Sequence, residues 1–165
     1  MIQVLILMGS DSDAAIMGAA GEVLTGLGVS WEMTVASAHR SPERVMRLVR
    51  EAPARGVRIF IVGAGAAAHL AGVVAAHTTF PVIGVPIDSS ALKGLDALLS
   101  TVQMPPGVPV ATVAIGKPGA TNAGVLAAQI LALGDAGVEQ RLKAYKAELA
   151  EKVEAAARRL ERPPT

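Results

Sequence analysis

A short polar segment, residues 37–42 with the sequence Ser-Ala-His-Arg-Ser-Pro, holds the side chains best suited to chemistry. His39 can exchange a proton near neutral pH, and the planar guanidinium of Arg40 can bind a phosphate or a carboxylate through paired N–H groups. Side by side, these residues indicate an anionic substrate and acid/base chemistry. The alternative is a pair that only stabilises the turn after a strand, and the residue types alone leave both interpretations open.

A second polar segment, residues 9–13 with the sequence Gly-Ser-Asp-Ser-Asp, follows the first apolar run of the chain. Its hydroxyls and backbone N–H groups precede a predicted helix, which is a favourable place for a phosphate or a ribose. Because a carboxylate would repel a phosphate, Asp13 is expected either to cap the helix or to accept hydrogen bonds from ribose hydroxyls. A capped loop without a ligand is the alternative.

The third segment, residues 63–68, reads Gly-Ala-Gly-Ala-Ala-Ala and fits the dinucleotide-binding pattern G-x-G-x-x-G/A, with Asp88 further along the chain. A nicotinamide-dependent oxidoreductase is therefore one alternative function. The fingerprint normally lies in the first strand–helix unit, however, and the chain has no room for a separate catalytic domain. His69, next to this loop, could line the same pocket as His39, whereas His77 is expected to end a helix and has no assigned role.

These segments lie in a chain that repeats one pattern: a short Val/Ile/Leu run, a polar or glycine-rich loop, and a helical stretch. The alternation predicts an α/β fold, a three-layer doubly wound parallel sheet of flavodoxin-like type. Ligands bind such sheets at the carboxyl ends of the strands, so the loops after the first four strands are expected to open on one edge. Strands are predicted at 2–8, 31–36, 57–62, 82–85 and 110–115, helices at 13–27, 42–54, 67–77, 120–133 and 135–161, and a long functional loop at 86–109 around a helical patch at 95–99.

Local signals mark several helix ends. Gly28 and Gly56 stand where a residue with positive φ closes a helix. Ser41 suits the N-cap of the second helix, Pro42 suits its first position, and Glu43 places negative charge at the positive end of the helix dipole.

Composition excludes several classes of protein. With 165 residues, 52% of them apolar, the chain is expected to form a single domain over residues 1–165. Its 15 basic and 14 acidic residues give a net charge of +1 with no basic tract, so nucleic-acid binding is not expected. The absence of cysteine excludes disulfides and thiolate metal sites, and the start of the chain predicts a strand and no signal peptide, so a cytoplasmic location is expected.

Residues 59–87 contain no Asp, Glu, Lys or Arg, and a stretch of this length could cross a bilayer about 30 Å thick. Glycines, histidines and a proline interrupt the stretch, and its two ends have the length of strands. Buried strands of a parallel sheet are also continuous apolar runs. Two strands joined by a helix are therefore predicted here, and no membrane span.

The last predicted helix, residues 135–161, has the clearest helical period in the chain. Such a period fits a helix that lies on its own domain. At a rise of about 1.5 Å per residue, however, the helix is longer than a small domain is wide, so part of it is expected to pack on a neighbouring subunit. The apolar positions are Val138, Leu142, Tyr145, Leu149, Val153, Ala156 and Leu160.

Several motifs in the same order resemble the N5-carboxyaminoimidazole ribonucleotide mutase family of purine biosynthesis. They are the segments 9–13, 37–42, 63–70 and 103–110, and Ala-Ile-Gly-Lys at 114–117 adds to the match. The resemblance extends from residue 4 to about residue 133, and the C-terminal helix matches only loosely. A series of motifs in one order is far more specific than any one of them.

The resemblance implies an isomerase that moves a carboxylate from the exocyclic amine N5 to ring carbon C4 of 5-aminoimidazole ribonucleotide, by CO2 release and recapture, with no metal and no other cofactor. It also implies a cytoplasmic homo-octamer. By position, His39 corresponds to the catalytic histidine, which would act as the general acid and base. Ser10, Asp13 and Arg40 fall on substrate-binding positions, and Ser37, Gly65 and His69 are expected to bind substrate beside them.

The chain departs from the family pattern at two positions. Where the family has Gly-Gly-Ala-Ala-His-Leu-Pro-Gly, Ala66 replaces a glycine and Ala71 replaces the proline. If position 66 requires a positive φ, alanine would be strained there. A related branch carboxylates aminoimidazole ribonucleotide directly with CO2 but lacks the Ala-Ala-His-Leu run, so a mutase is favoured over this alternative. A nucleotide-binding module without catalysis is a third possibility.

Overall fold

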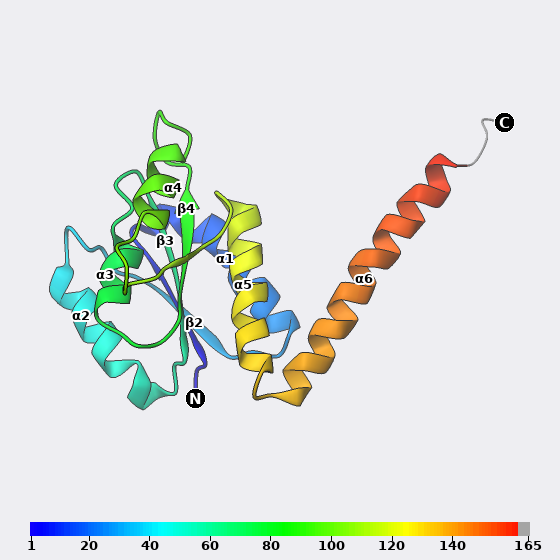
Figure 1. Ribbon diagram of the computed structural model, residues 1–165, viewed down its shortest axis with the longest axis horizontal. Helices are drawn as coiled ribbons and strands as arrows, with labels where there is room; N and C mark the ends of the chain where they lie inside the picture. The colour runs from blue at the N-terminus through cyan, green and yellow to red at the C-terminus, as the bar shows by residue number, and fades with distance from the viewer. Residues whose placement is uncertain (162–165) are drawn as a thin grey trace.

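A five-stranded parallel sheet forms the centre of the protein in the computed structural model, which describes residues 1–161 (Figure 1). The strand order is β2-β1-β3-β4-β5, and every neighbouring pair is parallel. This is the order of a flavodoxin-like doubly wound sheet, so the predicted fold is confirmed. The strands are β1 (Val4–Met8), β2 (Trp31–Val35), β3 (Ile59–Gly65), β4 (Val82–Ile87) and β5 (Ala111–Thr112).

Helices cover both faces of this sheet and produce two cores. One core joins a face of the sheet to the helices α1, α5 and the start of α6, and the other joins the opposite face to α2 and α3. The short α4 packs on β4 and β5. The helices are α1 (Ala14–Gly26), α2 (Pro42–Glu51), α3 (Leu70–Ala76), α4 (Leu95–Val102), α5 (Lys117–Ala132) and α6 (Ala136–Leu160), with 3-10 turns η1 (Asp11–Asp13) and η2 (Pro53–Arg55).

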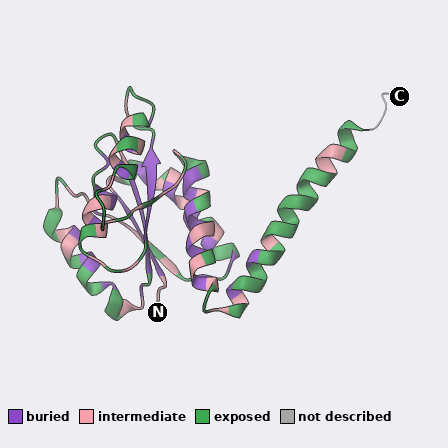
Figure 2. Cartoon of the chain, viewed as in Figure 1, coloured by how far each residue is buried: buried purple, intermediate pink, exposed green. Residues whose placement is uncertain are grey.

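Successive side chains of β1 point to opposite faces of the sheet, and this explains why all residues of the strand are apolar. Val4 and Ile6 point into the core under α1 and α5, while Leu5 and Leu7 point into the core under α2 and α3. All four are fully buried, as the purple strands of Figure 2 show. A strand with a core on each face needs no polar side.

The uncharged stretch 59–87 forms β3, α3 and β4. Two strands joined by a helix were the predicted interpretation, and the structure confirms it. Within the described residues, no helix combines the length and the hydropathy needed to span a bilayer.

The glycines predicted at helix ends have the expected positive φ, but the predicted N-cap of α2 makes no capping hydrogen bond. Gly28 and Gly56 have φ values of +66° and +93°, as predicted. Ser41 is at the N-cap of α2, but its hydroxyl does not cap the helix; it accepts from the Ser37 N–H and donates to the Ser37 carbonyl, both at 3.3 Å. Ser41 therefore closes the preceding turn, which is the loop that carries His39.

Several elements are shorter than predicted, and the difference is largest in one strand and one helix. The strand expected at 110–115 covers only Ala111–Thr112, although the Val113 N–H still donates to the Gly84 carbonyl. The helix expected from residue 67 begins at Leu70. Ala66 has a φ of 50°, and this left-handed residue keeps the chain in a tight turn through residue 69.

Helix α6 extends well beyond the sheet (Figure 1). Its 25 residues span about 37 Å, and its buried side chains, Val138 and Leu142, both belong to its first two turns. The Arg141 Nε donates to the Leu27 carbonyl at the end of α1 and fixes this first part of the helix. Beyond it, Leu149 and Val153 are 44% and 68% exposed.

Replacing Ala66 by glycine is expected to stabilise the protein. A left-handed φ destabilises an alanine by about 1–2 kcal/mol, and glycine removes this strain. The greater freedom of glycine in the unfolded chain opposes the gain by about 0.4–1 kcal/mol. The free energy of unfolding, measured by urea denaturation, should therefore rise by up to about 1.6 kcal/mol in Ala66→Gly. The control Ala67→Gly, where φ is not positive, should lower it. A loss of stability in Ala66→Gly would contradict strain at this position.

Candidate functional site

The carboxyl ends of the first four strands lie at one level of the sheet. Met8, at the end of β1, pairs with Val35 at the end of β2 and with Gly63 in β3, and Gly63 pairs with Val85 in β4. The strand order also reverses between β1 and β3, the position where ligands bind in sheets of this topology. The loops that follow these strands therefore open on one edge, as predicted.

A cavity of about 280 Å³ lies at this edge. Every residue predicted to belong to the site lines it, together with several that were not predicted. The predicted lining residues are Ser10, Asp13, Ser37, His39, Arg40, Gly65 and His69, and the additional ones include Ser12, Ala38, Ala64, Ala67, Leu70 and Ser89.

The loop after β1 is held by a reciprocal pair of hydrogen bonds. The Ser10 hydroxyl accepts from the Ser12 N–H at 3.3 Å, and the Asp13 carboxylate accepts from the Ser10 N–H at 3.2 Å. The expectation that Asp13 caps the helix that follows is wrong, because Asp13 makes no side-chain cap on α1; its carboxylate instead completes a capping box with Ser10 in the 3-10 turn η1.

Asp13 is buried, with only 6% of the residue exposed. Burial raises the pKa of its carboxyl above the ordinary value, and the hydrogen bond from the Ser10 N–H partly opposes the increase. The Asp13 carboxyl, whose charged form is disfavoured by burial, therefore lines the cavity as a hydrogen-bond acceptor. Hydroxyl groups of a ligand could donate to it.

The loop after β2 is a tight turn that positions Arg40 across the edge of the sheet. The Ser41 N–H donates to the Ser37 carbonyl at 3.0 Å, and the Arg40 N–H donates to the Ser37 hydroxyl at 3.2 Å. The guanidinium then reaches the neighbouring loop, where Nη2 donates to the Gly9 carbonyl at 2.9 Å. These bonds occupy part of the guanidinium and leave further N–H groups for an anion.

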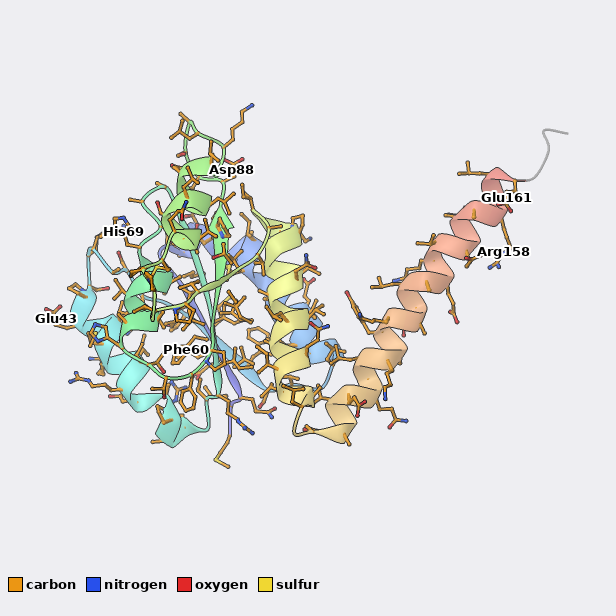
Figure 3. All side chains as sticks on the ribbon, viewed as in Figure 1. Glu43, Phe60, His69, Asp88, Arg158 and Glu161 are labelled. Atoms are coloured by element: carbon orange, nitrogen blue, oxygen red, sulfur yellow. The ribbon has the colours of Figure 1, made fainter. Side chains whose placement is uncertain are left out.

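The loop after β3 brings a second histidine to the first. His39 Nε2 and His69 Nδ1 are 2.8 Å apart, and the two rings are nearly perpendicular, at 88°. Figure 3 shows His69 on the loop that leads into α3. The expectation that the two histidines line one pocket is confirmed.

Gly65 also has a specific packing reason. A Cβ on Gly65 would lie 1.8 Å from the Ser89 hydroxyl, so any side chain here would displace the loop after β4. The glycine thus allows two loops to approach closely at the edge of the cavity.

The dinucleotide interpretation of residues 63–68 is wrong. Gly63 and Gly65 both lie inside β3 and pair with Val85 and Ile87 of β4, so they do not form a phosphate-binding turn at the start of a helix. Asp88 is exposed and does not line the cavity (Figure 3).

Ser12 and Ser89 line the cavity but were not singled out from the sequence. Ser12 belongs to the predicted loop 9–13, so its hydroxyl could have been included on type alone. Ser89 had no such signal beyond its place after a strand, because its contact with Gly65 depends on the pairing of β3 with β4.

The site contains one guanidinium, two imidazoles, one buried carboxyl and several hydroxyls. Within residues 1–161, no group of three or more His, Cys, Asp or Glu side chains is placed to hold a metal ion. The arrangement can bind an anion and a polyol beside a pair of groups that exchange protons.

Comparison with known proteins gives consistent results. The N5-carboxyaminoimidazole ribonucleotide mutase of Pyrococcus horikoshii is 51% identical over 156 residues, 94% of this chain and 87% of that protein. The enzyme of the same name from Thermotoga maritima is 50% identical over 98% of this chain and 93% of its own length.

A solved structure, the crystal structure of Treponema denticola PurE, superimposes with a TM-score of 0.88 at 30% identity, covering 98% of this chain and all of that one. The family model described as AIR carboxylase matches residues 3–152, and the chain therefore belongs to the AIR carboxylase family.

Proposed function

We propose that this protein converts N5-carboxyaminoimidazole ribonucleotide to 4-carboxy-5-aminoimidazole ribonucleotide, an isomerisation of purine biosynthesis. The family and the two mutases at about half identity support this activity. The observation that carries the proposal is the meeting, in one cavity, of an acid/base histidine, an arginine and a hydroxyl-rich loop.

The cavity offers a partner for each part of a ribonucleotide. Arg40 and the hydroxyl of Ser10 would hold the phosphate, and the Ser37 hydroxyl keeps the Arg40 side chain in place. Asp13 would accept from the ribose hydroxyls. Gly65 lines the cavity through its backbone alone, since Ser89 occupies the space where its side chain would lie, and it would contact the imidazole through that backbone.

His39 is proposed to carry the single proton that the isomerisation moves. In the forward direction, protonated His39 gives its proton to N5 as the N–C bond of the carbamate breaks and CO2 leaves. C4 then attacks CO2, a C–C bond forms, and neutral His39 removes the C4 proton. Recapture is efficient only if CO2 stays beside C4, since proximity then replaces a bimolecular encounter.

The second candidate is direct carboxylation of aminoimidazole ribonucleotide by CO2, because the matching family model is described as AIR carboxylase. Both reactions form the same C–C bond and need the same proton carrier. They differ in whether the carboxylate arrives on N5 of the substrate. The names of the relatives at about half identity favour the mutase.

We also propose that the protein acts as a cytoplasmic homo-oligomer, an octamer by family resemblance, in which the outer half of α6 packs on a neighbouring copy. Leu149, Val153 and Leu160 form an exposed apolar stripe on that half, and among residues 1–161 they belong to neither core. Figure 2 shows that the outer half of α6 is mostly exposed. A second exposed apolar surface lies on and before α4, at Leu92, Leu95, Leu99 and Val102. Such surfaces on one chain are suited to covering each other between copies.

The first test measures interconversion of the two carboxylated ribonucleotides by purified protein without added cofactor. His39→Asn should lose turnover by about 10²-fold or more while substrate binding persists, because it removes the proton carrier. The matched control His77→Asn changes a histidine outside the cavity and should keep full activity. Turnover that survives in His39→Asn would contradict the assigned role.

The same assay with aminoimidazole ribonucleotide and bicarbonate alone separates the two candidates. A mutase should convert the N5-carboxylated substrate much faster than it carboxylates the free ribonucleotide. Faster carboxylation of the free ribonucleotide would instead establish the carboxylase.

Asp13→Asn is expected to weaken the pH dependence of the free energy of unfolding and to lower the affinity for the ribonucleotide. A carboxyl with a raised pKa in the folded protein binds its proton more tightly there than in the unfolded chain, so the free energy of unfolding falls as pH rises from about 3.8 through the folded-state pKa. Asparagine still accepts from the Ser10 N–H but carries no charge. In urea denaturation, the free energy of unfolding of the variant should decline less above pH 3.8 than that of the wild type. The affinity of the variant for the ribonucleotide should fall.

The control for this measurement is Asp88→Asn, an exposed carboxyl outside the cavity that should follow the wild-type pH dependence. A variant Asp13→Asn with an unchanged decline above pH 3.8 would show that Asp13 is not the cause.

The oligomer is tested by light scattering after gel filtration. Val153→Glu places a charge on the apolar stripe of α6 and should reduce the mass of the assembly. Lys152→Glu, one position away on the helix, is the charge-change control and should leave the mass unchanged. A wild-type protein that elutes with the mass of one chain would exclude this interface.

A further inference from the structure

The contact between His39 and His69 determines where hydrogens can sit on both rings. At 2.8 Å, the two nitrogens must share a hydrogen bond, and the space between them holds one hydrogen. One ring therefore donates and the other accepts. Within residues 1–161, neither ring makes another side-chain hydrogen bond, so this contact makes the tautomer of one ring depend on that of the other.

The direction of the bond follows from the role of His39. If His39 Nε2 carries the shared hydrogen, the other ring nitrogen, Nδ1, has its lone pair free to take a proton. His69 then accepts through Nδ1 and carries its own hydrogen on Nε2. Both rings are in the Nε2–H form, which is the more stable tautomer of an unconstrained neutral histidine.

We propose that His69 is a positioning residue that accepts the Nε2–H of His39 and so prepares Nδ1 of His39 to exchange the substrate proton. This inference rests on the proposed function and adds to it the atom that reacts and the group that prepares it. His69 itself does not touch the reacting proton.

The hydrogen bond stays favourable through the proposed cycle. When His39 Nδ1 takes the C4 proton, the ring becomes a cation that still donates its Nε2–H to neutral His69, and a bond from a charged donor is stronger. When His39 returns a proton to N5 of the substrate, the neutral pair is restored. The proton count balances, since the proton removed from C4 equals the proton delivered to N5.

Two different loops of the cavity hold the two rings. His39 lies in the turn closed by the Ser41 N–H and the Ser37 carbonyl, and the His69 N–H donates to the Ala67 carbonyl at 2.8 Å. The rings meet edge to face, with centroids 4.9 Å apart. Neither ring is buried, so the hydrogen bond and not the packing of a core sets their orientation.

The test compares His69→Leu, which removes the acceptor, with His69→Asn, whose side-chain carbonyl can accept the same hydrogen. The kcat for interconversion should fall roughly 10- to 100-fold in His69→Leu, less than the 10²–10⁴-fold that proton transfer itself contributes, with KM little changed. His69→Asn should recover most of kcat. His77→Leu is the matched control and should behave as wild type.

Nitrogen NMR of protein labelled at its histidines gives a second readout, and the chain has only 3 histidines to assign. In the wild type, Nε2 of His39 should give a protonated, pyrrole-type signal and Nδ1 a pyridine-type signal. In His69→Leu, the His39 signals should move toward averaged values as the two tautomers mix. A pyridine-type Nε2 on His39 in the wild type would overturn the proposal.

The two proposals fail in different ways. Wild-type protein that does not interconvert the ribonucleotides refutes the proposed function, and the NMR comparison still tests the histidine pair. Normal wild-type turnover with full kcat in His69→Leu refutes only the positioning role.

Discussion

The parallel register of the first four strands is the constraint on which the site depends. Because β1 pairs with both β2 and β3, and β3 with β4, the ends of these strands stay at one level. Loops that are far apart in the chain then begin side by side. A shift in register of one residue would move the side chains of a strand from one core into the other and disrupt the packing of both, so the two cores maintain the register.

The loops add a second level of order through bonds between neighbours. Arg40 donates to the Gly9 carbonyl, His39 meets His69, and Gly65 lets Ser89 approach. Two of these contacts join loops of adjacent strands, and the histidine contact joins the loop after β2 to the loop after β3, across the end of β1. The cavity is therefore not a gap between independent segments, because the side chains that line it also hold its walls together.

Much of this arrangement could be predicted from sequence. The alternation of apolar runs and polar loops indicated the doubly wound sheet, and the position of each polar loop after a strand indicated the shared edge. The segments 9–13 and 37–42 were recognisable because hydroxyls, a carboxylate, a histidine and an arginine have few structural reasons to gather after buried strands. The AIR carboxylase family match agrees with that interpretation.

The remaining features depend on geometry between loops, which no local pattern encodes. The Ser41 hydroxyl bonds to the backbone of Ser37 and caps no N–H group of α2, and the local sequence does not distinguish these two uses of a serine. β5 is short because only two residues, Ala111 and Thr112, pair with β4 before the chain turns away. The dinucleotide-binding pattern at 63–68 gave a wrong interpretation, since glycines with the same spacing also occur inside a strand that packs closely against another loop.

Features that lower the stability of the fold concentrate at the carboxyl edge of the sheet, whereas the sheet and its two cores are regular. The buried Asp13 carboxyl and the left-handed Ala66 each lower stability where the cavity forms, and beyond the loop after β4 the Asp96 Oδ1 is buried without a hydrogen-bond partner among residues 1–161. A stable fold does not need these features, and a scaffold of β1, β3 and β4 with fully buried side chains can tolerate them. Their position agrees with a site in which binding groups are held in place before the ligand arrives, so that less order has to be created on binding.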